Sequence, residues 1–255
     1  MAHQQELTVH QFGSNAEQYL ASEVHSKGAD LAQLVAIVQA MPSVRALDLG
    51  CGAGHVAYAL ARGGARQVVA CDPSSEMLGV VAQEALRRGH EAIQTRVGTA
   101  ETLPFENGSF DLVVTRYSAH HWANVPRALE ECARVTAQGG RLIVIDVVAP
   151  EAPLLDTSLQ VIEFLRDASH VRDYRISEWR DMQKAAGFAE SSVRSWKTPI
   201  DFPAWIARIG TPPGRVAALQ TVFQSLPREA VDYFHVSDGF SFECDTAWME
   251  STKVA

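Results

Sequence analysis

Two patterns of apolar residues alternate along the chain. One is a short continuous apolar run, and the other is an apolar residue at every third or fourth position, as in an amphipathic helix. The short apolar runs predict buried strands at 44–49, 67–71, 92–97, 110–115 and 141–147. The amphipathic stretches predict helices at 12–39, 56–62, 75–88 and 125–135. Strands that alternate with helices are typical of α/β proteins, and they predict a Rossmann-like, doubly wound sheet with helices on both faces.

The pattern is looser after Pro150. It predicts a helix with a polar loop, a helix, a strand, a helical insertion and a last strand, at 151–175, 177–186, 191–196, 199–235 and 240–246. The chain has no repeat and no low-complexity linker. We therefore expect the C-terminal part to be a cap on the same domain.

Composition narrows the possible partners. The chain has 255 residues and a formal net charge of −8 at pH 7, so we expect no nucleic-acid partner. The four cysteines include no C-x-x-C pair, which predicts no zinc site and suits a cytoplasmic protein. No secretory signal is visible, and no apolar run approaches the roughly 18 residues of a membrane span, so we expect no stable membrane insertion.

Three glycines at alternate positions follow the first predicted strand. Gly50, Gly52 and Gly54 permit a positive φ and leave the backbone open to a ligand. Asp72, 20 residues after Gly52, is placed to accept hydrogen bonds from ribose hydroxyls. This spacing fits both a dinucleotide and S-adenosylmethionine (SAM). Asp48 favours SAM, because a carboxylate before the turn suits a cationic ligand and disfavours a pyrophosphate.

Further motifs follow in order along the chain. The stretches A-E-x-L-P-F, F-D-x-V-V and Gly-Gly-Arg-Leu occupy 100–105, 110–114 and 139–142. Together with Asp-x-Gly-Cys-Gly-x-Gly at 48–54, this series resembles the class I SAM-dependent methyltransferases. The closest resemblance is to the ubiquinone/menaquinone-biosynthesis type of small-molecule methyltransferase, and it spans roughly residues 12–148.

The resemblance implies a seven-stranded sheet with helical additions at both ends. The implied parts are an N-terminal helical lid, a SAM-binding core, and a segment with the remaining strands and a helical substrate cap, at 1–40, 41–150 and 151–255. The implied cofactor is SAM, which leaves as S-adenosylhomocysteine (SAH).

The resemblance also assigns residues to the cofactor. These are Asp48, Gly50, Cys51, Gly52, Gly54, Asp72, Pro73, Met77, Thr99, Ala100, Glu101, Arg116 and Tyr19. It places Asp72 at the ribose, and Ala100 and Glu101 at the adenine edge. Thr99 stands where many relatives have an acid that accepts from the adenine amino group. Tyr19 belongs to a stretch that looks like the family's lid, although simple packing of the first helix explains it equally well.

Methyl transfer is an in-line displacement in which the protein mainly aligns the reactants and excludes water. A positioned base typically adds about 10²–10⁴-fold when the acceptor must lose a proton. The candidates are His120, His121, Tyr117 and His170. Neighbouring histidines point in different directions, so at most one of His120 and His121 is expected to face the substrate. The pair lacks the partner ligands of a metal site.

The sequence thus predicts methyl transfer to a small, aromatic or lipophilic metabolite. Residues 115–118 lack the Asn/Asp-Pro-Pro-aromatic motif of amino-group methylation, which disfavours a nucleic-acid methyltransferase. A non-catalytic SAM-binding module and an NAD-dependent reductase are the alternatives. The sequence leaves open which acceptor atom is methylated and whether the chain forms a homodimer.

Overall fold

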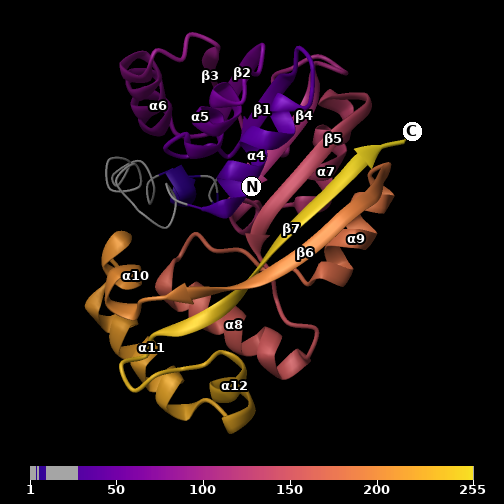
Figure 1. Ribbon diagram of the computed structural model, residues 1–255. Helices are drawn as coiled ribbons and strands as arrows, with labels where there is room; N and C mark the ends of the chain where they lie inside the picture. Colours follow the sequence, from indigo (N-terminus) through magenta and orange to yellow (C-terminus); the bar gives the residue numbers. More distant parts are fainter. Residues whose placement is uncertain (1–3, 5, 10–27, 255) are drawn as a thin grey trace.

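The computed structural model describes residues 4, 6–9 and 28–254, and its centre is one seven-stranded sheet (Figure 1). The strands are β1 (Arg45–Leu49), β2 (Gln67–Asp72), β3 (Ile93–Val97), β4 (Phe110–Arg116), β5 (Thr136–Val147), β6 (Phe188–Ile200) and β7 (Phe242–Lys253). Their order across the sheet is β3-β2-β1-β4-β5-β7-β6. The first five strands pair in parallel, and β7 is antiparallel to both β5 and β6. The predicted seven-stranded α/β fold is confirmed.

Helices cover both faces of the sheet and build the cap. They are α4 (Ala29–Gln39), α5 (His55–Arg62), α6 (Ser75–Arg88), the 3₁₀ turn η1 (Ala119–His121), α7 (Val125–Val135), α8 (Pro153–Arg166), α9 (Ile176–Ala185), α10 (Phe202–Arg208), α11 (Pro213–Ser225) and α12 (Arg228–Tyr233). Residues 4 and 6–9 are also helical. Most of the predicted lid, including Tyr19, lies outside the described residues.

The alternation of side chains along the strands explains the two layers of helices. Ala46, Leu112 and Ile143 contribute to one buried cluster together with α4, α5 and α6. Their neighbours Leu47 and Val113 contribute to the opposite cluster with α7 and α9. Because successive residues of a strand face opposite sides of the sheet, fully apolar strands are expected where both faces are covered.

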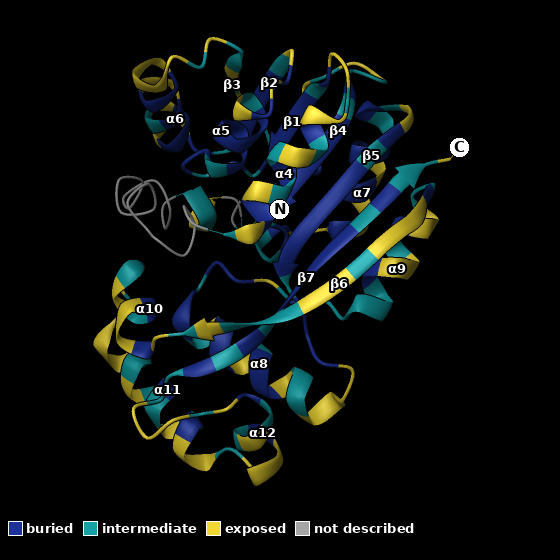
Figure 2. Cartoon of the chain, viewed as in Figure 1, coloured by how far each residue is buried: buried dark blue, intermediate teal, exposed yellow. Residues whose placement is uncertain are grey.

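The cap is joined to the sheet by the long β6–β7 pair. Both strands run beyond the end of β5 into a lobe that contains α8, α10, α11 and α12 (Figure 1). Phe202, Trp205, Phe223, Phe234 and Phe242 form much of the buried centre of this lobe. β6 forms the edge of the sheet and exposes many of its side chains, whereas β5 is buried over most of its length (Figure 2).

Three of the predicted strands differ markedly in length from the observed ones. β5 begins at Thr136, directly after α7, and not at the predicted position 141, so Gly139 and Gly140 lie within the strand. β6 extends to both sides of the predicted 191–196, and β7 continues seven residues past the predicted 240–246. Pairing with β5 and β6 sets the length of β7, and this pairing is not visible in a local hydrophobic pattern.

Candidate active site

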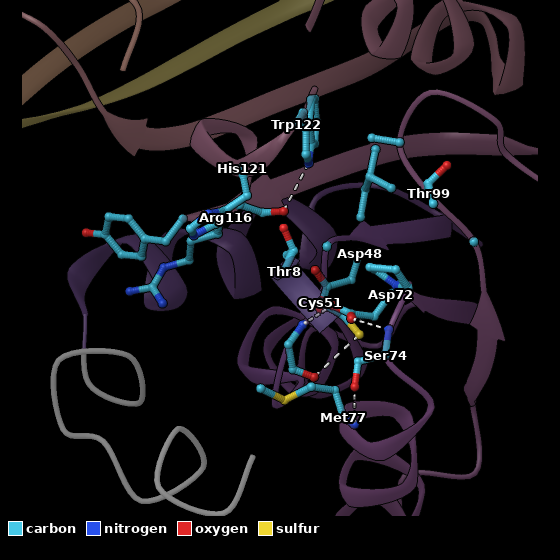
Figure 3. A pocket seen from close by; sticks show the side chains of 18 of the residues that line it. Thr8, Asp48, Cys51, Asp72, Ser74, Met77, Thr99, Arg116, His121 and Trp122 are labelled. Carbon is cyan, nitrogen blue, oxygen red and sulfur yellow. Dashed lines mark hydrogen bonds between the residues drawn. The ribbon is translucent and has the colours of Figure 1, made fainter. Parts of the chain in front are cut away.

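A cleft of about 1090 Å³, including its open mouth, lies at the carboxyl ends of β1, β2 and β4. The strand order reverses between β1 and β4, and open α/β sheets bind their ligands at such a point. Residues 48–53, 55–56, 72–74, 77, 98–101, 116–118 and 121–123 line the cleft, together with residues 8 and 9. In Figure 3, Asp72, Ser74 and Met77 come from the β2–α6 turn, and His121 and Trp122 from the turn after β4.

The glycine turn between β1 and α5 brings bare backbone to the cleft. Gly50, Gly52 and Gly54 have φ values of +67°, +47° and +84°. A Cβ added to Gly50 would lie 1.8 Å from the Ser118 hydroxyl, whereas one added to Gly52 would meet nothing within 4 Å. Gly50 therefore allows the turn to pack against the β4 end, and Gly52 leaves open space on the ligand side.

Asp48 is buried at the end of β1, where it supports the glycine turn from below. Its Oδ2 accepts a hydrogen bond of 2.8 Å from the N–H of Ala57, in the first turn of α5. Burial raises the pKa of Asp48 to about 7, and the nearby charge of Asp72 acts in the same direction. A cationic ligand above the turn would favour the ionised form of Asp48.

Asp72 joins the glycine turn to the start of α6. Its Oδ2 accepts from the N–H of Gly52 and its Oδ1 from that of Ser74, both at 2.9 Å (Figure 3). The Ser74 hydroxyl in turn accepts from the N–H of Met77 and caps α6. Burial raises the pKa of Asp72 to about 6, although the two backbone hydrogen bonds oppose this shift. Each oxygen keeps a second lone pair for a ligand hydroxyl.

The turn after β3 forms another wall of the cleft. Thr99, Ala100 and Glu101 all line it, and Thr99 pairs with Thr102 across this turn. The Glu101 carboxylate accepts from the N–H of Asn124 at 3.2 Å. This contact ties the turn to the start of α7, so Glu101 has a structural role beside its position at the cleft.

Arg116 and Tyr117 lie at the end of β4. Arg116 Nε donates to Asp30 of α4 at 2.5 Å, and both side chains are almost fully buried. The Arg116 guanidinium also lies over the ring of Tyr117, 4.7 Å from its centroid. Tyr117 has a φ of +51°, which is uncommon for a residue other than glycine and typical of ligand sites. Burial raises the pKa of its phenol, which makes Tyr117 a poor base.

The three candidate histidines come together, but only His121 lines the cleft. The ring centroids of His120 and His121 are 4.2 Å apart, and those of His120 and His170 are 5.8 Å apart. His120 Nδ1 lies 2.6 Å from Asp146 Oδ1 at the end of β5. His170 is buried behind them. The structure thus orders the candidates by their access to a ligand.

The structure brings most of the other predicted residues to the same cleft. Among the predicted cofactor residues that it describes, only Gly54 does not line the cleft. A Cβ on Gly54 would lie 3.0 Å from Tyr58 and Val81, so this glycine instead permits close packing of the turn.

Thr8, Val9 and Trp122 also line the cleft and were not predicted from the sequence. Asp146 was not predicted either, although it is a lone carboxylate near the end of an otherwise apolar strand.

Comparisons with known proteins agree with this geometry. Residues 47–144 match the methyltransferase domain family. Over 226 residues the chain is 38% identical to the uncharacterised methyltransferase YcgJ of Bacillus subtilis, with 89% of each chain covered. The chain belongs to the class I SAM-dependent methyltransferases. The crystal structure of YcgJ matches this methyltransferase with a TM-score of 0.84, over 88% of this chain and 98% of YcgJ.

Two further relatives cover different shares of the methyltransferase. The uncharacterised protein YafE of Escherichia coli is 44% identical over 74% of this chain and 91% of its own. The ubiquinone/menaquinone biosynthesis C-methyltransferase UbiE of Rhizobium leguminosarum is 33% identical over 60% of this chain and 62% of its own.

Proposed function

We propose that this methyltransferase binds SAM in the cleft and transfers its methyl group to a small, aromatic or lipophilic metabolite. The observation that carries the proposal is the junction of Asp72 with the glycine turn at the switch point of the sheet. SAM supplies a methyl group on a sulfonium, which is already an activated leaving group. The protein's contribution is therefore alignment of the two reactants and exclusion of water.

The residues of the cleft fit each part of SAM. Asp72 keeps lone pairs for the ribose hydroxyls, and the open space above Gly52 accommodates the close approach of a ligand. Asp48, under the glycine turn, would add negative charge that favours the sulfonium and amino groups of bound SAM. Thr99 and Glu101 stand at the wall proposed for adenine, where the Thr99 hydroxyl would replace the usual acid.

The proposed acceptor class rests on the lining residues that the cofactor assignment leaves unused. Val9, Tyr117 and Trp122 provide apolar and aromatic surface, and His55 and His121 provide polar groups. Apolar walls with a few polar groups are typical of sites for small organic ligands. UbiE, whose name refers to methylation in quinone biosynthesis, supports an acceptor of this kind.

Two other functions fit the cleft less well. An NAD-dependent reductase would have to place a pyrophosphate at the glycine turn, near the carboxylate of Asp48, which is electrostatically unfavourable. A non-catalytic SAM-binding module would bind SAM and SAH without turnover of any acceptor.

Calorimetric titration with SAM, SAH and NADH tests the proposal. We expect SAM and SAH to bind and NADH not to bind. Asp72→Ala should weaken binding of both adenosyl ligands by at least about tenfold, because ribose hydrogen bonds and the anchor of Gly52 are lost together. The matched control is Asp111→Ala, which removes a carboxylate from the start of β4, where it pairs with Arg45. Binding of NADH instead of SAM would support the reductase.

A further inference from the structure

Seven titratable side chains meet behind one wall of the cleft. They come from η1, β5, α8 and the loop after α8, and they are His120, His121, Asp146, Glu163, Asp167, His170 and Asp173. All but His120 and His121 are buried, and only His121 lines the cleft. Charged groups that are buried together influence one another's protonation, so the charge of each histidine in this cluster depends on its neighbours.

Ser169 determines which nitrogen of His121 carries the proton. His121 Nδ1 lies 3.1 Å from the Ser169 carbonyl oxygen, and a carbonyl can only accept. Nδ1 must therefore donate, so the lone pair of the neutral ring is on Nε2. Asp167 holds Ser169 in place, since its Oδ1 accepts from both the N–H and the hydroxyl of Ser169. The tautomer of His121 is thus set by the Ser169 carbonyl, and Asp167 holds Ser169 in place.

Asp146 favours the doubly protonated, charged form of the His120 ring. Asp146 Oδ1 lies 2.6 Å from His120 Nδ1, and its two oxygens also accept from the N–H groups of Ala119 and Val147. Burial opposes the charge on His120, but attraction to Asp146 and their hydrogen bond outweigh it and raise the pKa of His120 to about 9. His120 is then an imidazolium at neutral pH.

The charged neighbours of His120 and His121 shift the pKa values of the two imidazoles in opposite directions. Burial and the positive charge of His120 lower the pKa of His121 to about 4, although Asp167 and Asp146 partly oppose this. Asp173 and Glu163 also favour the charged form of His120, although burial raises the pKa of both carboxyls. His170 is kept neutral by burial, and His120, His121 and Arg166 lower its pKa further. Of the three histidines, His120 is therefore the charged one at neutral pH, and His121 is uncharged.

We propose that His121 is the proton acceptor of the cleft, and that His120 and Asp146 are positioning residues that keep His121 unprotonated. This inference rests on the proposed methyl transfer. Nε2 of His121 takes the proton from an O–H or N–H of the acceptor. A lone pair of that oxygen or nitrogen forms the bond to the methyl carbon, and the pair of the broken carbon–sulfur bond stays on sulfur. The electron pair of the broken O–H or N–H bond remains on the oxygen or nitrogen.

A weakly basic imidazole is sufficient for this step. The acidity of an O–H or N–H group rises steeply as its heavy atom forms the bond to carbon, so the proton transfers late in the displacement. The inference therefore narrows the acceptor class to molecules with a hydroxyl or amino group at the reacting position.

Nitrogen-15 NMR of the histidines in the ligand-free protein tests the inference without an acceptor. We expect His121 to be neutral with its proton on Nδ1 from pH 6 to 8, and His120 to be charged up to about pH 9. In Asp146→Asn, His120 should lose its charge near neutral pH, and the pKa of His121 should rise by at least one unit. Asp111→Asn, far from the cluster, should change neither histidine.

A charged His121 at pH 7, or an Asp146→Asn protein in which both histidines titrate as before, would overturn the inference. Diethyl pyrocarbonate, which acylates only unprotonated imidazole, gives a second measurement on the wild-type protein in case the variant does not fold. We expect acylation of His121 and not of His120 at pH 6.5, and the reverse selectivity would contradict the inference. SAH titration of the same sample tests the proposed function separately, because the NMR result does not depend on ligand binding.

Discussion

Gly52 combines a backbone conformation that favours glycine with a position that faces the open space of the cleft. Its φ of +47° is costly for any residue with a side chain, and a Cβ there would project into the cleft without meeting protein atoms. We expect Gly52→Ala to lower the free energy of unfolding by about 1 kcal/mol while weakening SAM binding by more than tenfold. Urea denaturation and calorimetric titration of the same preparation measure the two effects.

Gly64 provides a matched control for this change. It has a φ of +87°, and a Cβ on it would also meet nothing within 4 Å, but it lies after α5 and away from the cleft. Gly64→Ala should have a similar cost in stability and leave SAM binding unchanged. Equal losses of binding in both variants would show that backbone strain, and not occupation of the cleft, is responsible.

At the scale of elements, α4 is attached to the end of β4 by one buried ion pair. Arg116 and Asp30 are 5% and 6% exposed, so removal of one partner leaves a buried charge without its counterion. We expect Asp30→Asn to lower the free energy of unfolding by about 3 kcal/mol. The double variant Asp30→Asn with Arg116→Met should recover part of this loss, as measured by urea denaturation.

The ion pair of Arg45 and Asp111, at the start of β4, serves as the comparison for the buried pair. Their side chains are 35% and 34% exposed, and pairs that water reaches contribute little. Asp111→Asn should therefore cost no more than about 1 kcal/mol. If both substitutions had the same effect on stability, burial would not be what gives the Asp30 pair its importance.

For some strands, the local hydrophobic pattern is sufficient to predict the boundaries. β1, β2 and β4 are short, apolar and buried on both faces, and their predicted boundaries lie within one residue of the observed ones. β7 carries polar residues among its apolar ones because β5 and β6 cover its edges and the cap covers its start. Its extent depends on these distant partners, so a period read along the chain underestimates it.

At the scale of the whole molecule, the histidine cluster connects the sheet to the cap. Asp146 ends β5, His120 belongs to η1, and the carbonyl of His120 accepts from the N–H groups of Val171 and Arg172 in the loop after α8. Because the pKa of His120 is raised from 6.5 to about 9 on folding, its protonation favours the folded state. This stabilisation is complete below about pH 6.5 and is lost as the pH rises through about 9.

The difference in stability between the wild type and Asp146→Asn should therefore depend on pH. A shift of this size corresponds to about 3 kcal/mol. We expect the variant to be least stable relative to the wild type at pH 6.5, and the difference to shrink by about 3 kcal/mol at pH 10. Urea denaturation across this range measures it. Asp111→Asn should show a constant difference, since its partner is an arginine that does not titrate there; a constant difference for Asp146→Asn would contradict the assignment.

None of the described helices is both long and apolar enough to cross a membrane.

The cleft is lined by residues that are far apart in the sequence. Thr8 and Val9 reach it from the N-terminal helix, and Gln4 Nε2 donates to the Ser169 carbonyl that also binds His121. Side chains that line the cleft thus come from the first ten residues as well as the β4 end, and the loop before α9 holds His121 through the Ser169 carbonyl.

The sequence by itself determined the family, the order of strands and helices in the core, and most of the residues at the proposed cofactor site. These are encoded locally, because a glycine turn between a buried strand and a helix needs a specific run of residues. Only the tertiary structure decided that His121, and not His120 or His170, faces the cleft, and that Asp146 and Ser169 divide the protons between the first two. Such roles depend on contacts between residues 26 and 48 positions apart, about which a local pattern carries no information.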